Sequence, residues 1–176
     1  MAKLTLYIAC SLDGYIATTQ HNLDWLHAYE SAGEDYGYHD FYARIGITLQ
    51  GYDTFRYVEA MDIPYPFEGK TSYVFSRQPR QSRWPVHFVQ DNPAQFIQKL
   101  KEESEQDIWL IGGGQIVARC LEQQLIDEYI ISYIPLLLGK GIPLFLPIDI
   151  QNQLALIGHK AFSNDLLQVH YKNISS

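Results

Sequence analysis

Cysteine is scarce in this 176-residue sequence, which contains Cys10 and Cys120 and no other cysteine. Two cysteines are too few for a disulfide scaffold, and both fall in apolar segments predicted as a strand and a helix, so we expect free, buried thiols. Neither a His/Cys cluster nor an HExxH pattern is present, which leaves a metal site without support. The GxSxG pattern of serine hydrolases is also missing.

Positive charge is in short supply as well. The sequence has 13 Lys and Arg residues against 20 Asp and Glu residues, a formal net charge of -7, and its basic residues form no cluster. Binding to nucleic acid or to an anionic membrane surface is therefore disfavoured. A phosphorylated small molecule is still compatible, because backbone N–H groups and one or two local arginines are enough to bind it.

Long hydrophobic runs are missing too. No apolar stretch approaches the roughly 20 residues needed to cross a bilayer, since Pro135, Gly139 and Pro143 interrupt the longest candidate. The first residues lack the charged region, long apolar region and cleavage site of a secretory signal, so we expect a cytoplasmic protein. The hydrophobic content of 47% and the lack of repeats or linkers predict one domain over residues 1–176.

The most informative stretch is 107–119, where an apolar run ends in Gly112-Gly113-Gly114 and helical spacing follows. This order indicates a strand that turns directly into a helix. Glycines let a ligand come close, and the free N–H groups of a first helical turn favour a phosphate. Taken alone, the stretch fits an anion site and a tight connection equally well. It lacks the Lys-Ser/Thr of a P-loop and the spacing of GxGxxG, which argues against nucleotide hydrolysis and a standard dinucleotide fold.

Hydrophobic periodicity predicts strands that alternate with helices. Strands are predicted over 3–10, 47–50, 70–77, 86–89, 107–111 and 127–134, and helices over 36–45, 54–60, 93–103 and 114–123. Asn92 is expected to cap the third helix, with Pro93 in its first turn. Residues 11–17 and 135–145 are expected to be loops, and 153–161 with 166–174 a closing antiparallel pair. The pattern predicts an α/β fold whose mostly parallel sheet gains antiparallel strands at its C-terminal end.

In this order the pieces resemble the dihydrofolate reductase fold, and most closely the C-terminal reductase domain of the riboflavin-pathway deaminase-reductases, as a stand-alone member. The resemblance covers nearly the whole chain and is carried by Ser11–Ala17, Asp24-Trp25-Leu26, Gly51 with Thr54-Phe55, Val74–Arg77, Ile111–Gly114, Leu125–Glu128 and Pro135–Phe145. It implies a three-layer fold in which helices flank a central mixed, mostly parallel sheet. It also implies an NAD(P)H-dependent reductase that passes hydride to a small heterocyclic or ribosylamine substrate, similar to 5-amino-6-(5-phosphoribosylamino)uracil reductase.

The same resemblance implies the residues that bind the cofactor. Ala9 and Cys10 would offer backbone groups to the nicotinamide carboxamide, and Ile16 would lie against the ring. A cis peptide bond is expected between Gly112 and Gly113. The pyrophosphate would lie at the start of the following helix, and the 2′-phosphate after the third strand. The residues implied for the pyrophosphate are Thr54, Gly113, Gly114 and Gln115, and those for the 2′-phosphate are Ser76 and Arg77. Further residues implied to bind the cofactor are Gly51, Ile111, Gly112 and Ile116.

The sequence departs from the family pattern at the adenosine end. Relatives usually carry Gly-Arg-x-Thr after the second strand, and that arginine reaches the 2′-phosphate. Here Tyr52 takes the place of the arginine and Asp53 adds a negative charge. Ser76 and Arg77 would then hold the phosphate unaided, because one arginine can bind it through two parallel hydrogen bonds. NADPH is the expected cofactor, with NADH as the alternative, and Thr54 is interpreted as a pyrophosphate ligand or a helix N-cap.

A proton donor is needed because hydride transfer to a C=N bond leaves negative charge on nitrogen. Asp35 is the first candidate, with helix capping as the alternative interpretation. Asp13, beside the nicotinamide loop, and Trp25, as a wall or water anchor, are the other two. Asp127 and Glu128 are expected to orient the entry of a strand and to do no chemistry.

Three readings of the function stay open. A riboflavin-pathway substrate would need basic residues for its phosphate, and Lys140 is the one candidate that the sequence offers. Dihydrofolate reduction is the second reading, supported by Asp35 and Trp25. The third, from another class, is a non-catalytic nucleotide-binding or oligomeric protein on the same fold. A homodimer is expected because the apolar 135–145 segment needs cover.

Overall fold

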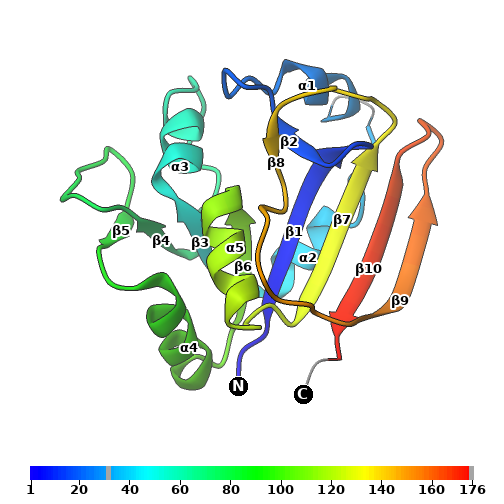
Figure 1. Cartoon of the computed structure of the whole chain (residues 1–176). Helices are drawn as coiled ribbons and strands as arrows, with labels where there is room; N and C mark the ends of the chain where they lie inside the picture. Colours follow the sequence, from blue (N-terminus) through cyan, green and yellow to red (C-terminus); the bar gives the residue numbers. More distant parts are fainter. Residues whose placement is uncertain (31–32, 175–176) are drawn as a thin grey trace.

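The centre of the molecule is an eight-stranded sheet in the order β5-β4-β3-β6-β1-β7-β10-β9, shown in Figure 1. The computed structural model describes residues 1–30 and 33–174. The strands of this sheet are β1 (Leu4–Ser11), β3 (Ile45–Gly51), β4 (Thr71–Phe75), β5 (Val86–Val89), β6 (Asp107–Gly112), β7 (Glu128–Ile134), β9 (Leu154–Ala161) and β10 (Leu167–Asn173). A second, two-stranded sheet joins β2 (Tyr15–Ala17) to β8 (Ile142–Pro143).

The pairing between strands confirms the predicted sheet. Every ladder from β5 to β7 is parallel, whereas β10 is antiparallel to both of its neighbours, β7 and β9. The carboxyl ends of β4, β3, β6, β1 and β7 therefore lie at one edge of the sheet, here called the carboxyl edge. The opposite edge, where these strands begin, is the amino edge.

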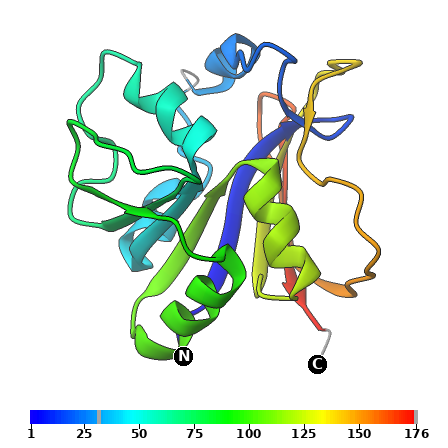
Figure 2. The same ribbon diagram turned by 60° about the vertical axis from the view of Figure 1, so that its left-hand side comes forward.

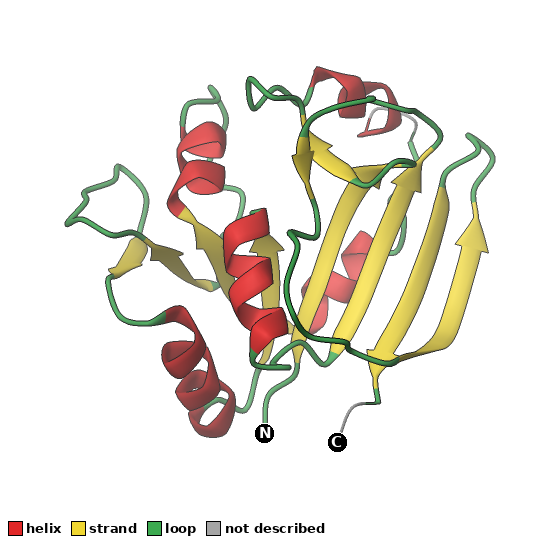
Figure 3. Cartoon of the chain, viewed as in Figure 1, coloured by secondary structure: helices red, strands yellow, loops and turns green. Residues whose placement is uncertain are grey.

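Helices lie on both faces of the sheet and form the three layers expected, while α1 lies beyond the carboxyl ends of β1 and β7 (Figures 1, 2 and 3). They are α1 (Asp24–Glu30), α2 (Tyr38–Arg44), α3 (Tyr52–Glu59), α4 (Pro93–Glu103) and α5 (Gly114–Glu122). Alternation along the strands assigns the two faces. Leu6 and Leu110 belong to the main core together with Val117 of α5 and Ile97 of α4. On the other face, Tyr7, Trp109 and Ile130 belong to a second cluster, together with Phe41 of α2.

Several local predictions hold. The Asn92 side chain caps α4 by accepting hydrogen bonds from the backbone N–H groups of Ala94 and Gln95, at 3.0 and 3.4 Å. Cys10 and Cys120 are free and buried. Within residues 1–30 and 33–174, no helix is long and apolar enough to cross a membrane.

The predicted boundary between the helix over 36–45 and the strand over 47–50 is wrong by two residues. The prediction ended the helix near Gly46 and began the strand at Ile47, but α2 ends at Arg44 and β3 starts at Ile45. Gly46 is a strand residue that lies against the side chain of Gln106, because a Cβ atom at Gly46 would come within 2.3 Å of Gln106 Oε1. This glycine allows a close approach and does not mark a turn.

Short elements were missed in the N-terminal third and in the apolar loop. α1 was not predicted, and the expected loops at 11–17 and 135–145 contain β2 and β8, which pair with each other. Gly141 makes this pairing possible, because a Cβ atom there would lie 2.3 Å from the carbonyl oxygen of Ala17. The loop after β1 therefore covers part of the apolar 135–145 segment.

Candidate functional site

The residues predicted to bind a dinucleotide lie along the carboxyl edge. Ser76 and Arg77 follow β4, Gly51 ends β3, and the triple glycine ends β6 and opens α5. Ala9 and Cys10 lie near the end of β1. Neighbouring strands are about 4.8 Å apart, so the row from β4 to β1 spans three spacings, roughly 14 Å. The fold thus brings these residues into one row along the carboxyl edge.

The starts of α3 and α5 meet at the middle of this row. A Cβ atom on Gly113 would lie 3.1 Å from Thr54 Oγ1, and one on Gly51 would lie 3.3 Å from Ile116 Cγ1. The peptide bond between Gly112 and Gly113 is cis, as expected. Gly51 and Gly113 are the N-caps, and neither helix has a side-chain cap hydrogen bond among the described residues, so the N-cap interpretation of Thr54 is wrong. Two sets of first-turn N–H groups are left for an anion or water.

β1 and β6 separate where the row reaches β1. Their ladder ends at Leu6 and Leu110, whereas the ladder between β1 and β7 continues to Ser11 and Ile134. The backbone at Ala9 and Cys10 therefore has a ladder partner on one side only. Ile16 in β2 packs against the main core and is half-buried. Burial raises the pKa of the Cys10 thiol to about 12, so this thiol is neutral and unreactive at pH 7.

The β4 end of the row carries the predicted phosphate ligands. The Ser76 hydroxyl donates a hydrogen bond of 2.8 Å to the carbonyl oxygen of Gln78, which fixes the turn. Arg77 is exposed, and the described part of the chain gives its guanidinium neither a hydrogen bond nor an ion pair. Its N–H groups are available to an incoming anion.

Asp13 and Asp35 both accept hydrogen bonds from the backbone. Asp13 accepts from the Ser11 hydroxyl at 2.6 Å and from the N–H groups of Leu138 and Gly139, at 3.1 and 2.7 Å, and so ties the loop after β1 to the 135–145 loop. Asp35 accepts from the N–H groups of Gly37 and His39, at 2.9 and 3.1 Å, and supports the start of α2.

These bonds decide the protonation of the two carboxyls. The hydrogen bond from Ser11 is the main cause that lowers the pKa of Asp13, and the one from the Gly37 N–H is the main cause for Asp35. Both groups are therefore ionised at neutral pH and act as acceptors in the free protein. Whether either takes part in proton transfer stays a prediction.

Among the buried polar atoms that lack a partner within the described residues, two belong to Trp25 and Gln50 near this edge. One is the indole Nε1 of Trp25, whose ring packs in the cluster that contains Ala9, Ile134 and Leu136. The other is Oε1 of Gln50, a side chain only 1% exposed that pairs in register with Gly112. Sequence reasoning missed Gln50, although a glutamine that ends the apolar run Ile45–Leu49 was a usable signal. Unpartnered buried polar atoms in a native fold are rare and suggest ligand contacts.

A hollow of about 350 Å³ lies beside α3. It combines His21 and Arg56 with one carboxylate, Asp53, and its full lining is Gln20, His21, Asp53, Arg56, Tyr57 and Ala60. Because Asp53 directly follows Tyr52 and precedes Thr54, the hollow borders the middle of the row. Lys140 was the one basic residue that the sequence offered for a substrate. Arg56 was missed, because only the fold shows that it lines this hollow.

The RibD C-terminal domain model matches residues 2–168 of the chain. The chain belongs to the RibD C-terminal domain family. Among its relatives, the uncharacterized protein YwjB of Bacillus subtilis is 38% identical over 170 residues, which cover 96% of this chain and 97% of YwjB. The uncharacterized protein YyaP of the same organism is 29% identical over 180 residues, covering 96% of this chain and 94% of YyaP.

Solved structures agree with membership of the RibD C-terminal domain family. A putative riboflavin biosynthesis protein from Shewanella sp. PV-4 superposes with a TM-score of 0.87 and 29% identity, covering 99% of this chain and 100% of that one. The deaminase/5-amino-6-(5-phosphoribosylamino)uracil reductase of Thermotoga maritima gives a TM-score of 0.72 at 16% identity, over 98% of this chain and 56% of that one. At this identity the second match shows the fold alone, which is the dihydrofolate reductase-like fold predicted.

Proposed function

We propose that this RibD C-terminal domain is a reductase that uses a nicotinamide dinucleotide, with NADPH preferred. The observation that supports the proposal best is the meeting of two helix starts at Thr54 and Gly113, with no side-chain cap among the described residues. Two converging helix N-termini favour a pyrophosphate more than one does, because the partial charges of both act on the same anion.

The order of the row supports a position for each other part of the dinucleotide. Ser76 and Arg77 would hold the 2′-phosphate. The residues that would line the pyrophosphate are Thr54, Gly113, Gly114, Gln115 and Ile116. The nicotinamide would lie where β1 and β6 separate, against Ile16 and the open backbone at Ala9 and Cys10. Bound there, it would supply the hydride. The β2–β8 sheet stands beside this place and would limit the access of water.

The substrate would be a small heterocyclic or ribosylamine compound bound on the α1 and α2 side of the carboxyl edge. Trp25 would donate its free indole N–H to the substrate or to an ordered water. Asp35 and Asp13, both ionised, would orient the proton-carrying water and not deliver their own protons. If Asp35→Asn leaves the pH profile of turnover unchanged, Asp35 has no part in proton transfer.

The hollow beside α3 would receive the anionic part of the substrate. Arg56 has no ion pair among the described residues and can bind a phosphate or a carboxylate there. This fits the ribosyl phosphate of a riboflavin-pathway pyrimidine, and it also fits the glutamate tail of dihydrofolate. Single-turnover oxidation of bound NADPH with each of the two compounds would separate these alternatives.

Fluorescence titration of the Trp residues with NADPH and NADH tests the proposal directly. We expect saturable quenching at micromolar NADPH. Binding of neither dinucleotide at millimolar concentration would exclude the reductase function and leave the non-catalytic alternative on the same fold. Binding of NADPH without oxidation by either substrate would place the substrate outside both classes.

We further propose a homodimer in which β9 and β10 supply the contact surface. Edge strand β9 exposes 38% of Leu154, 53% of Leu156 and 47% of Ile157, and the neighbouring Leu167 of β10 is 41% exposed. Exposed apolar residues on an edge strand favour pairing with a second copy. The 135–145 loop adds Leu137 and Phe145 as exposed apolar residues. A monomer at micromolar concentration in sedimentation would contradict this proposal.

A further inference from the structure

An arginine that is remote in sequence lies on Tyr52, the residue that replaces the expected arginine. The guanidinium carbon of Arg80 lies 4.3 Å from the centre of the Tyr52 ring. Tyr52 itself packs against Phe55 and Phe88, with ring centres 6.5 and 6.4 Å away. Because these contacts hold the Tyr52 ring in place, the ring restricts the position of the Arg80 guanidinium.

Arg80 differs from the other stacked arginine of the same loop, Arg83. The Arg83 guanidinium donates to the carbonyl oxygens of Glu59 and Met61, at 2.9 and 3.0 Å, and also lies over Trp84. Its role is to fix the loop. Arg80 is exposed and, within residues 1–30 and 33–174, makes neither a hydrogen bond nor an ion pair.

Stacking orients Arg80 without using its donors. The guanidinium carbon lies over the ring, and no N–H of Arg80 is used in a hydrogen bond or an ion pair among the described residues, so its donors are free for an anion. The fork matches the geometry of a phosphate and can bind it bidentately. Asp53, the nearby carboxylate in sequence, does not pair with Arg80 in the described structure and lines the hollow that also contains Arg56.

We propose that Arg80, oriented by Tyr52, is a ligand of the 2′-phosphate of NADPH. It acts there with Arg77 and replaces the arginine that relatives carry where this chain has Tyr52. The proposal rests on the proposed function, because it concerns the adenosine end of the same cofactor site. It makes Tyr52 a positioning residue for Arg80. Preference for NADPH over NADH then depends on a contact between Tyr52 and Arg80, which are 28 positions apart in the sequence, as well as on Arg77.

Calorimetric titration of wild type and Arg80→Ala with NADPH, NADH, adenosine 2′,5′-bisphosphate and adenosine 5′-monophosphate tests this assignment. We expect Arg80→Ala to weaken binding of the two 2′-phosphorylated ligands about tenfold and to leave the other two unchanged, since a charge-assisted bidentate contact is lost. Tyr52→Leu should weaken the same two ligands by about threefold, because the guanidinium is no longer held. Arg119→Ala, which removes an exposed arginine paired with Glu122 on α5, is the control and should change nothing.

The outcomes separate this proposal from the proposed function. If wild type binds NADPH and NADH equally, or if Arg80→Ala weakens all four ligands alike, Arg80 is not the 2′-phosphate ligand, and the reductase proposal stands. Full recovery of NADPH affinity in Arg80→Lys would show that charge alone suffices and would overturn the role of the stacked fork. If wild type binds no dinucleotide, both proposals fail.

Discussion

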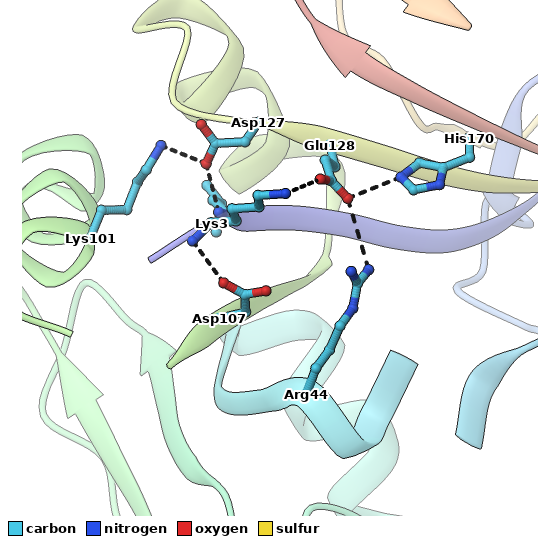
Figure 4. Close-up of polar contacts among 8 residues, drawn as sticks. Lys3, Arg44, Lys101, Asp107, Asp127, Glu128 and His170 are labelled. Carbon is cyan, nitrogen blue, oxygen red and sulfur yellow. Dashed lines mark hydrogen bonds and ion pairs between the residues drawn. The ribbon is translucent and has the colours of Figure 1, made fainter. Parts of the chain in front are cut away.

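The polar groups at the two edges of the sheet differ in whether they have partners within the chain. At the amino edge, side chains pair with each other and Asp107 accepts the backbone N–H of Lys3, as Figure 4 shows; the paired side chains are Lys3, Arg44, Lys101, Asp127, Glu128 and His170. At the carboxyl edge, two helix starts lack side-chain caps and the polar atoms of Trp25 and Gln50 lack partners among the described residues. The charged groups named at the amino edge have partners within the chain, whereas these groups of the carboxyl edge have none in the part of the chain that the structure describes.

Glu128 is the centre of the amino edge. Its two carboxylate oxygens lie 2.7 Å from Lys3 Nζ and 3.0 Å from His170 Nε2, and Arg44 is 3.8 Å away. Asp127, the preceding residue, accepts the N–H of Leu4 at 2.7 Å and pairs with Lys101 at 2.7 Å. These contacts hold the starts of β1 and β7 together across more than 120 residues of sequence, which is the orienting role expected for both acids.

This difference suggests that the amino edge serves stability and the carboxyl edge serves binding. Paired charges at the amino edge contribute to stability, whereas the groups left open at the carboxyl edge are available for binding at some cost in stability. Substitutions at the amino edge should therefore change stability without changing affinity. Those at the carboxyl edge should do the reverse.

The largest effect is expected for Glu128→Gln. The change leaves Lys3, Arg44 and His170 without their shared carboxylate, and we expect a loss of about 2 kcal/mol at pH 7, below the range for a fully buried pair because Lys3 and Arg44 are partly exposed. Urea denaturation measures the loss. Affinity for NADPH should be unchanged, and a tenfold change would show that the two edges are coupled.

The stability difference between wild type and Glu128→Gln should also depend on pH. Burial alone would raise the pKa of the Glu128 carboxyl, but hydrogen bonds from Lys3 and His170 outweigh burial and hold the pKa below its usual value of 4.5. The carboxylate therefore stabilises the fold above about pH 4.5, and its contribution is lost as the pH falls through the folded pKa. The stability difference between wild type and Glu128→Gln should shrink on acidification from pH 6 to pH 3. A constant difference would contradict the assignment.

Gly113→Ala should have the second largest effect, at the carboxyl edge. The backbone of Gly113 suits alanine, with φ −74° and ψ −174°, and the new methyl group would meet only Thr54 Oγ1 at 3.1 Å, which can move. Stability should change by less than about 1 kcal/mol. Affinity for NADPH should fall at least about tenfold, since the methyl group occupies the proposed pyrophosphate position.

Gly158→Ala is the matched control for this substitution. Its nearest neighbour would be His170 Cβ at 3.9 Å, an ordinary contact, and β9 lies away from the row. Neither stability nor NADPH affinity should change beyond error. Unchanged affinity in Gly113→Ala would move the pyrophosphate away from the two helix starts and remove the main support for the reductase proposal.

The sequence predicted the long elements well because their signals are local. The Asn92-Pro93 cap, the apolar run that ends in three glycines and the alternation along β1 each lie within about ten residues and were read correctly. The failures concern elements of two to seven residues. β2 and β8 exist because they pair with each other, and no periodicity of three and two residues reveals that pairing.

Site residues that act through distant partners were also beyond the sequence. Asp13 reads as a turn residue, yet it joins two loops 125 residues apart. Arg80 reads as one more arginine in a polar loop, and Tyr52 reads as the loss of a phosphate ligand. Their contact became visible only when the chain brought the end of β4 beside the start of α3.

Gln50→Met sharpens the comparison at its most buried point, with the smallest expected effect. Gln50 Oε1 is desolvated without a donor among the described residues, so methionine of similar size should keep stability or raise it by up to about 1 kcal/mol. If the oxygen serves a ligand, affinity for NADPH or for the substrate should fall about threefold to tenfold, because the ligand loses an acceptor. Gln95→Met, the same change at an exposed position on α4, is the control and should alter neither quantity. A clear loss of stability in Gln50→Met with unchanged binding would mean that the glutamine supports the fold, which would place this part of the carboxyl edge with the paired groups of the amino edge.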